Sequence, residues 1–213
     1  MILFSDFDLT IYPSKFKTNI KAINKFVEND NIFIIATGRP YFSIIKHIKK
    51  IKYKYLIVND GAKIYDENNH LIYEQLINDN DKKEILSLVK EKYSKIILDD
   101  ERTSKIFIRF DNEEDAKIFL DNIKNKYPNL NGYLSRKYIN LLPNNISKAT
   151  AIDYLKNKHN YENIYVVGDG INDIEMFAQY PGISIKTSIE EVRQLAKYHV
   201  NEFKDIFKNE EIT

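Results

Sequence analysis

Short apolar runs alternate with amphipathic helical patterns through the first third of the chain, and this alternation restricts the fold more than any other feature. The runs are "MILFSDF", "NIFIIAT" and "YKYLIVND", and the helical patterns between them are "NIKAINKFVEND" and "PYFSIIKHIKKI". Continuous apolar runs are typical of strands buried on both faces, and their alternation with helices predicts parallel βαβ units. The pattern returns from about residue 144 in "SKATAIDYLKNKH", "NIYVVGDG", "NDIEMFAQY" and "GISIKT". We therefore predict an α/β fold with a doubly wound parallel-sheet core formed by residues 1–62 and 144–213.

Residues 63–143 interrupt this pattern and predict a second, small α+β domain. "AKIYDENNHLIYEQL" indicates a hairpin around residues 67–69. Two helix-strand-strand units follow, "DKKEILSLVKEKY" with "KIILDD" and "KIFIRF", then "EEDAKIFLDNIKNKY" with "NGYLS" and "YINLLP". Strands joined by tight turns pair antiparallel, so we expect an antiparallel sheet with two helices on one face.

The strands of this insert should present two different faces. Alternation places one apolar set, Ile106, Ile108 and Phe110, together on one side of "SKIFIRFD". We expect that side to meet the helices. The other residues of "SKIFIRFD" point to the face away from the helices, and the same alternation applies to "YINLL". That face is predicted to carry Lys105, Phe107, Arg109, Tyr138 and Asn140. A charged sheet face is usually only solvated, and that reading stays open for Lys105 and Arg109.

Composition excludes several kinds of function. The chain has no cysteine, which rules out disulfides, thiolate metal sites and a thiol nucleophile. Lys and Arg total 32 against 31 Asp and Glu, so no large field of one sign favours nucleic acid or an anionic membrane. The first residues lack a basic leader, and no apolar run approaches the roughly 20 residues of a membrane span. We predict a cytoplasmic monomer or weak dimer whose partner is a small molecule.

Four short stretches are placed at the carboxyl ends of predicted parallel strands, one of them at the start of a helix. They are "DFDLT", "ATGRP", "SKAT" and "GDGIND". Ligands of open α/β sheets bind outside the carboxyl ends of the strands, so the predicted fold would bring the four stretches together. Their convergence predicts one site.

The residue types in these stretches suit phosphoryl transfer. Asp6, Asp8, Asp169 and Asp173 are the candidate ligands of Mg²⁺, which prefers hard oxygen donors. Asp6 is also placed to attack a phosphoryl group, and Asp8 to protonate the leaving oxygen and later activate water. The candidate phosphate-binding groups are Thr37, Lys148 and the backbone near Gly38.

Each stretch also has an ordinary structural explanation when it is taken alone. A DxD pair is most often a solvated turn, "TGRP" can begin a helix, and "GDGIND" can form an Asx-rich turn. Lys148 alone would be a surface lysine in a first helical turn. The four features occurring together, in order and each near a strand end, make these separate explanations improbable.

The four motifs resemble, in order and spacing, those of the haloacid dehalogenase superfamily of phosphohydrolases. The insert after the third strand resembles the α/β cap of its Cof-like branch. This resemblance implies an Asp6 nucleophile, an Asp8 acid/base, and phosphate contacts from Thr37 and Lys148, with Asp169 and Asp173 on the Mg²⁺ side. By the same resemblance Asn172 supports the phosphate pocket, and Asn59 and Gly61 form the turn leading into the cap. "IKTS" at residues 185–188 departs from the Gly-Asn-Ala that is frequent in the family.

The predicted function is a Mg²⁺-dependent phosphatase that hydrolyses a small sugar phosphate or phosphoglycolate-like metabolite through an aspartyl phosphate. A phosphomutase, which uses the same intermediate, is the alternative, and a catalytically silent binding protein is a third reading. The motifs address the phosphoryl group and the metal, so we expect selectivity from other residues. The candidates are Arg39, Asn59, Lys105, Arg109, Tyr138 and Asn140.

Overall fold

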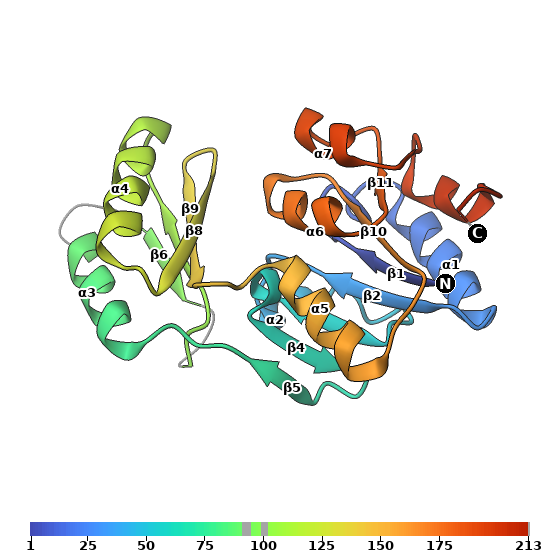
Figure 1. The fold of residues 1–213 in the computed structure, drawn as a ribbon, viewed down its shortest axis with the longest axis horizontal. Helices are drawn as coiled ribbons and strands as arrows, with labels where there is room; N and C mark the ends of the chain where they lie inside the picture. Colours follow the sequence, from blue (N-terminus) through green and yellow to red (C-terminus); the bar gives the residue numbers. More distant parts are fainter. Residues whose placement is uncertain (91–94, 99–101, 213) are drawn as a thin grey trace. The chain divides into compact units, whose positions relative to one another are not determined.

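A mainly parallel sheet organises the larger of two units in the computed structural model, which describes residues 1–90, 95–98 and 102–212 (Figure 1). This unit, called the core, comprises Met1–Ile72 and Ser147–Thr213. Its strands are β1 (Ile2–Ser5), β2 (Ile32–Ala36), β3 (Tyr55–Val58), β4 (Lys63–Asp66), β5 (Leu71–Glu74), β10 (Ile164–Gly168), β11 (Gly182–Ser184) and β12 (Tyr198–His199). They are ordered β12-β11-β10-β1-β2-β3-β4-β5. The strands from β12 to β3 run parallel, which confirms the predicted fold class.

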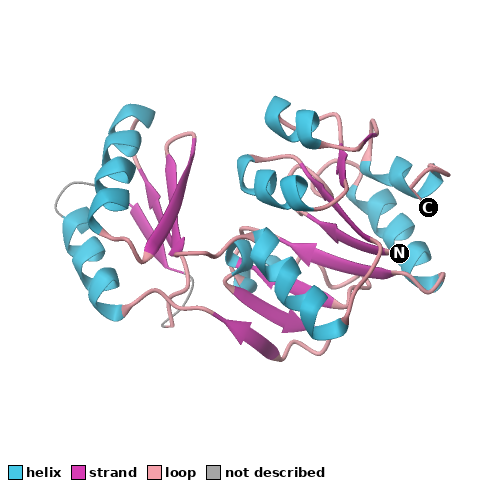
Figure 2. Ribbon diagram, viewed as in Figure 1, coloured by secondary structure: helices cyan, strands magenta, loops and turns pink. Residues whose placement is uncertain are grey.

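Helices cover the core sheet because its central strands bury both of their faces. Leu3 and Phe4 are adjacent in β1 and point to opposite sides, yet neither is exposed to solvent. Leu3 belongs to a hydrophobic cluster that includes Ile23 of α1. The helical elements are α1 (Phe16–Glu28), α2 (Tyr41–Ile44), η1 (Asn59–Gly61), α5 (Lys148–His159), η2 (Ile171–Asp173), α6 (Ile174–Gln179), α7 (Glu190–Leu195) and η3 (Phe203–Lys208), drawn in cyan in Figure 2.

The hairpin of β4 and β5 belongs to the core sheet, and this corrects the predicted boundary. We expected the insert to begin at residue 63, whereas β4 pairs antiparallel with β3, and β5 follows as the edge strand. The core extends to Ile72 and resumes at Ser147 rather than at residue 144. The hairpin itself was predicted correctly, but its alternating pattern could not reveal which sheet it would join.

The second unit, called the cap, comprises Tyr73–Ile146 and has its own sheet and core. Its strands are ordered β6-β7-β9-β8, and every neighbouring pair is antiparallel. The cap elements are α3 (Asp79–Lys90), β6 (Lys95–Leu98), β7 (Ile106–Arg109), α4 (Glu113–Lys126), β8 (Leu130–Ser135) and β9 (Tyr138–Pro143). Parts of two predicted elements, residues 91–93 of a helix and 99–100 of a strand, lie outside the described residues.

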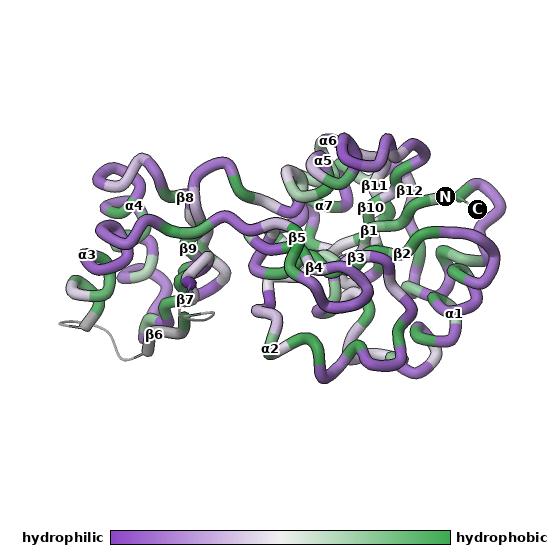
Figure 3. The backbone as a smooth tube through the Cα atoms, turned by 90° about the horizontal axis from the view of Figure 1, so that it is seen from below, coloured by the Kyte–Doolittle hydropathy of each residue, from purple (hydrophilic) through white to green (hydrophobic). Residues whose placement is uncertain are grey.

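The two faces of the cap sheet differ as predicted. Ile106 and Ile108 are fully buried in one cluster with Ile85 of α3 and Phe119 of α4. Along both helices hydrophobic and hydrophilic segments alternate, as Figure 3 shows, so that one side of each can face the sheet. On the other face of β7, Arg109 is exposed and Phe107 is partly exposed. The aliphatic face therefore holds the cap together.

Replacing Ile108 by alanine should destabilise the protein by about 2–5 kcal/mol, because the truncation leaves a cavity in the closed cap core. Ile118→Ala is a matched control, since that isoleucine lies on α4 and is 56% exposed. The control should change the free energy of unfolding by less than about 0.5 kcal/mol. Denaturant unfolding of the three proteins measures both values, and equal effects of the two substitutions would contradict this account of the cap.

Candidate active site

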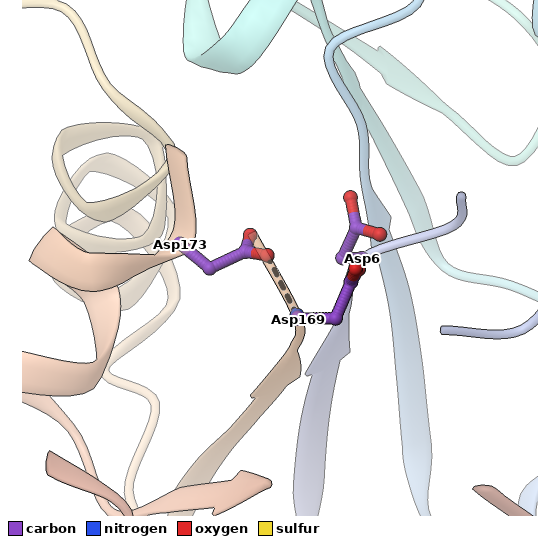
Figure 4. Close-up of side chains that lie close together, drawn as sticks. All are labelled: Asp6, Asp169 and Asp173. Atoms are coloured by element: carbon purple, nitrogen blue, oxygen red, sulfur yellow. Dashed lines mark hydrogen bonds between the residues drawn. The ribbon is translucent and has the colours of Figure 1, made fainter. Parts of the chain in front are cut away.

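Three acidic side chains meet at the carboxyl edge of the core sheet. Asp6 follows β1, Asp169 follows β10, and Asp173 ends the short helix η2 (Figure 4). Each offers a carboxylate oxygen within 4.8 Å of the others, and among the described residues they are the only group of three potential metal ligands. All three are buried. Neighbouring parallel strands end at one edge, and this is why residues so far apart in sequence converge.

Hydrogen bonds fix the orientation of two of these carboxylates. The backbone N–H groups of Asp169 and Gly170 both donate to Oδ2 of Asp173, each at 2.9 Å. The Thr10 hydroxyl donates to Oδ1 of Asp169 at 3.0 Å. A Cβ atom at Gly168 would lie 2.5 Å from the Asp173 carboxylate, so no larger residue fits there. The motif alone predicts no role for Thr10, and this hydrogen bond gives it one.

Lys148 lies between the acids rather than at the surface. Its ammonium group donates to Oδ1 of Asp6 at 2.5 Å and to Oδ1 of Asp173 at 2.7 Å, and its side chain has no exposed area. Lys148 is the first residue of α5, and Ser147 caps that helix through reciprocal hydrogen bonds with Thr150. These N-terminal hydrogen bonds of Ser147 fix where the helix begins, and therefore where the lysine side chain leaves it.

Burial and mutual repulsion shape the ionisation of the acids when no cation is bound. Burial raises the pKa of Asp6 well above its usual value against the field of Lys148, and the carboxylates of Asp173 and Asp169 add to the increase. Burial, with a further contribution from Asp173, raises the pKa of Asp169 to about 6. Burial alone would lower the pKa of Lys148, but Asp173 and Asp6 more than offset it and hold the lysine charged.

Asp8 forms an ion pair with Arg39 and is not part of the three-acid group, although we expected it among the metal ligands. The Arg39 guanidinium donates through Nε to Oδ2 of Asp8 at 2.7 Å and through Nη2 to Oδ1 at 2.5 Å. It also lies over the rings of Phe7 and Tyr12, at 5.3 and 5.6 Å from their centroids. Arg39, a predicted specificity residue, thus has an observed structural task in holding Asp8.

The remaining predicted core residues surround the same edge. Thr37 is fully buried after β2, and its hydroxyl accepts the N–H of Arg39 at 3.2 Å. Asn172 donates through Nδ2 to Oδ1 of Asp60 at 2.7 Å. A Cβ at Gly38 would lie 2.9 Å from the same Asp60 oxygen. Asp60 is buried, and sequence reasoning passed over it because an Asx residue before glycine reads as an ordinary turn.

The segment "IKTS" follows β11 and hydrogen-bonds to residues of two motifs. The Ser188 hydroxyl donates to the carbonyl of Gly168 at 2.8 Å, and it accepts the N–H of Ile185 at 3.0 Å. The Thr187 hydroxyl donates to the carbonyl of Leu9 at 3.0 Å. These hydroxyls tie the loop to the first and fourth motifs, so the departure from the family pattern supplies its own polar contacts.

The predicted specificity residues of the cap share the sheet face opposite its helices. Phe107 and Tyr138 stack with their ring centroids 5.2 Å apart, and Lys105 lies 5.8 Å from the ring centroid of Tyr133. Asn140 pairs in register with Phe107 across β7 and β9 and is buried. Arg109 is exposed at the end of β7. Asn59, the candidate from the core, is buried in η1.

The three-acid group has the donor chemistry of a magnesium site. It consists of carboxylate oxygens without nitrogen or sulfur ligands, and Mg²⁺ prefers such oxygen donors. Lys148 balances part of the negative charge when no cation is present. Asp6, Asp169 and Asp173 therefore fit a divalent cation.

Without a divalent cation, the contribution of Asp169 to stability should fall as the pH rises from about 4 to about 6. Its pKa is 3.8 in the reference state and about 6 in the folded chain, so the folded state binds more protons across this window. Asp169→Asn removes the titration and serves as the control. The free energy of unfolding of the wild type, measured in chelator relative to that of Asp169→Asn, should fall through this window and stay level above it.

Added Mg²⁺ should reverse this loss, because it binds the ionised carboxylates. The increase in melting temperature on adding Mg²⁺ should be larger near pH 7.5 than near pH 5, since protons compete for the ligands at the lower pH. Equal increases at both values would contradict the assignment of Asp169 to the cation.

None of the helices in the described ranges is long and apolar enough to cross a bilayer. Curated relatives match the sequence over different lengths. An uncharacterized protein of Mycoplasma capricolum is 33% identical over 104 residues, which are 44% of this chain and 39% of that protein. The match thus spans less than two thirds of that relative. A candidate phosphatase of Buchnera aphidicola subsp. Baizongia pistaciae is 27% identical over 219 residues, covering 82% of each chain.

Solved structures and a family model cover more of the chain. A haloacid dehalogenase-like hydrolase from Bacteroides thetaiotaomicron superimposes with a TM-score of 0.87 at 15% identity, over 97% of this chain and 98% of that one. The subclass IIB sugar phosphatase BT4131 superimposes with a TM-score of 0.76 at 19% identity, over 96% and 94% of the two chains. The family model for haloacid dehalogenase-like hydrolases matches residues 3–101 and 91–205. Together with the fold and the motif residues at its sheet edge, this match shows that the chain belongs to the haloacid dehalogenase-like hydrolases.

Proposed function

We propose that this chain is a Mg²⁺-dependent phosphatase that hydrolyses a small phosphorylated metabolite through an aspartyl phosphate on Asp6. The observation that carries the proposal is the meeting of Asp6, Asp169, Asp173 and Lys148 in one buried group. A nucleophilic carboxylate beside the buried ammonium of Lys148 and two further acids suits the transfer of a dianionic group. The name of the Buchnera relative supports the same activity.

In the first half-reaction, a carboxylate oxygen of Asp6 attacks phosphorus and the bond from phosphorus to the leaving oxygen breaks. The leaving oxygen takes a proton from Asp8, and an alcohol departs. The Lys148 ammonium, which contacts Asp6 in the structure, offsets the negative charge around the transferred group. Thr37 and the backbone near Gly38 are the proposed donors to the non-bridging oxygens.

In the second half-reaction, water attacks phosphorus of the aspartyl phosphate, and its proton passes to Asp8. The bond between phosphorus and Asp6 breaks, so inorganic phosphate leaves and both aspartates return to their starting states. One oxygen of Asp8 must turn from Arg39 to carry the proton, because the guanidinium donates to both oxygens in the structure. Mg²⁺ would be held by Asp6, Asp169 and Asp173, where it would supply positive charge and orient the phosphoryl group.

The proposed substrate is a small sugar phosphate or a phosphoglycolate-like acid. The likeness to the sugar phosphatase BT4131 supports the first class at the level of the fold. The cap supplies groups that suit both classes on the sheet face opposite its helices, with Arg109 able to pair with a carboxylate and the stacked rings of Phe107 and Tyr138 able to contact a sugar ring. Lys105 and Asn140 complete this set of proposed specificity residues.

A phosphate-release screen over sugar phosphates, phosphoglycolate, nucleotides and pyridoxal phosphate, with and without Mg²⁺, tests the proposal. Release of inorganic phosphate from at least one class, dependent on Mg²⁺, is the expected result. Product that keeps its phosphate and needs a bisphosphate activator would indicate a phosphomutase instead. Binding without any turnover would indicate a binding protein.

Asp6→Asn should abolish turnover while the protein stays folded, because the amide is not a nucleophile toward phosphorus. Asp8→Asn should slow turnover by about 10²- to 10⁴-fold, the usual contribution of a general acid-base group. Its loss should be greater for an alkyl phosphate than for an activated aryl phosphate, whose leaving group needs no proton. Activity of Asp6→Asn within a few-fold of wild type would refute the assignment of the nucleophile.

Chelation should remove activity, and Mg²⁺ should restore it. Ca²⁺ should bind the same acids but support little turnover, because it takes more ligands in a looser geometry than in-line transfer requires. Initial rates in EDTA, and after each cation is returned, measure this. Full activity in the chelator would be incompatible with the proposed mechanism.

Arg109→Ala should lower kcat/KM for the best natural substrate by about tenfold or more, and it should leave a small aryl phosphate almost unaffected. The reason is that the aryl group offers nothing for the guanidinium to hold. Lys124→Ala is the control, since it removes an exposed cation from α4 of the same unit. Equal losses on both substrates, or none on either, would show that Arg109 takes no part in selectivity.

A further inference from the structure

Asp60 is a buried carboxylate beside the site, and the proposed mechanism assigns it no task. It is 2% exposed and lies in the turn that joins β3 to β4. Three consecutive residues of this turn have positive φ angles, 51° at Asn59, 53° at Asp60 and 111° at Gly61. Non-glycine residues in this region cost of order 1 kcal/mol each and persist only where surrounding contacts hold them.

Contacts on several sides hold the turn in this conformation. The Asn59 N–H donates to the carbonyl of Arg39 at 3.0 Å, and the Asp60 N–H donates to the carbonyl of Thr37 at 3.1 Å. A Cβ at Gly61 would lie 2.1 Å from the carbonyl oxygen of Ser147, so the turn packs directly on the start of α5. The strained turn is therefore fastened to the second and third motifs.

The turn aims the Asp60 carboxylate at the fourth motif. Its Oδ1 accepts the amide Nδ2 of Asn172 at 2.7 Å and lies where Gly38 has no side chain. The Asp60 charge also helps to raise the pKa of Lys148, with a smaller effect than those of Asp173 and Asp6. One carboxylate thus links the segments that contain Gly38, Lys148 and Asn172.

An ionised carboxylate only accepts hydrogen bonds, and this determines which way the Asn172 amide faces. The NH₂ group must point toward Asp60, and within the described part of the chain its second N–H has no other partner and can donate elsewhere. A Cβ placed on Gly170 would lie 3.1 Å from Oδ1 of Asn172, so the oxygen occupies the side toward that glycine. If the amide flipped, an oxygen lone pair would take the place of an N–H and would repel an anion.

We infer that Asp60 is a positioning residue that orients Asn172 so that its free N–H donates to the phosphoryl group. The inference rests on the proposed phosphatase function, because it concerns the same phosphate pocket. This role predicts the opposite of what charge alone predicts for phosphate binding. Removing a negative charge near an anion site should strengthen phosphate binding, whereas loss of a positioning residue should weaken it.

A double-mutant cycle with inorganic phosphate as a competitive inhibitor tests this inference. Asp60→Ala and Asn172→Ala should each raise the inhibition constant for phosphate about tenfold, because the first releases the Asn172 amide to turn and the second removes its N–H. The double variant should also lose about tenfold, since both substitutions remove the same contact. Asp60→Asn keeps an acceptor oxygen and should lose no more than about threefold.

Asp153→Ala is the matched control, because Asp153 lies on α5 with Lys148 but its carboxylate bonds to Tyr180. It should lower the melting temperature without changing the inhibition constant for phosphate. If Asp60→Ala does not fold, Asp60→Gly, which suits the positive φ of 53° at this position, takes its place in the cycle, and its loss must disappear in the Asn172→Ala background.

Two results would overturn the inference while the proposed function stands. One is a double variant whose loss equals the product of the single losses, and the other is phosphate binding that is unchanged or tighter without Asp60. Failure of the proposed function has a different signature, since the wild-type protein would then neither release phosphate from any ester nor be inhibited by phosphate.

Discussion

The ammonium group of Lys148 contacts Asp6 and Asp173 with no exposed surface, and the arrangement of the sheet edge depends on this neutralisation. Two buried carboxylates without a counter-charge would cost several kcal/mol each. The lysine offsets part of that cost, but three acids face one ammonium. The imbalance makes a divalent cation suitable here. Burial raises the pKa of Asp169, and repulsion from Asp173 adds to the increase.

Local structure near the site serves this charge arrangement more than it serves packing. The backbone N–H groups of Asp169 and Gly170 point at Asp173, and Gly168 leaves room for that carboxylate. The two N–H groups and the missing side chain at Gly168 all serve to hold a charged oxygen in place. Residues of this kind are poor choices for stability alone, so their presence is better explained by chemistry.

The sequence was sufficient for the core fold and for the convergence of the motifs, because both follow from one rule. Parallel strands end at a common edge, so Asp6 and Asp169 had to meet once the strands were identified. Side-chain partners between motifs were not predictable. The pairing of Arg39 with Asp8 depends on rotamers and on the two rings beneath the guanidinium, and neither leaves a periodic signal. The β4–β5 hairpin, which we expected in the insert, pairs with the core sheet, because tertiary contacts decide which sheet edge a hairpin joins.

The place where the chain returns from the cap has a consequence for how such a protein can change. The core resumes at Ser147, which is also the residue that caps α5, and Lys148 comes next. The capping hydrogen bonds and the contact of Gly61 with the Ser147 carbonyl lie entirely within the core. The position of the lysine is therefore set by contacts that begin at Ser147 and lie within the core. A chimera could carry a different cap between residues 72 and 147 and still keep its charged centre intact.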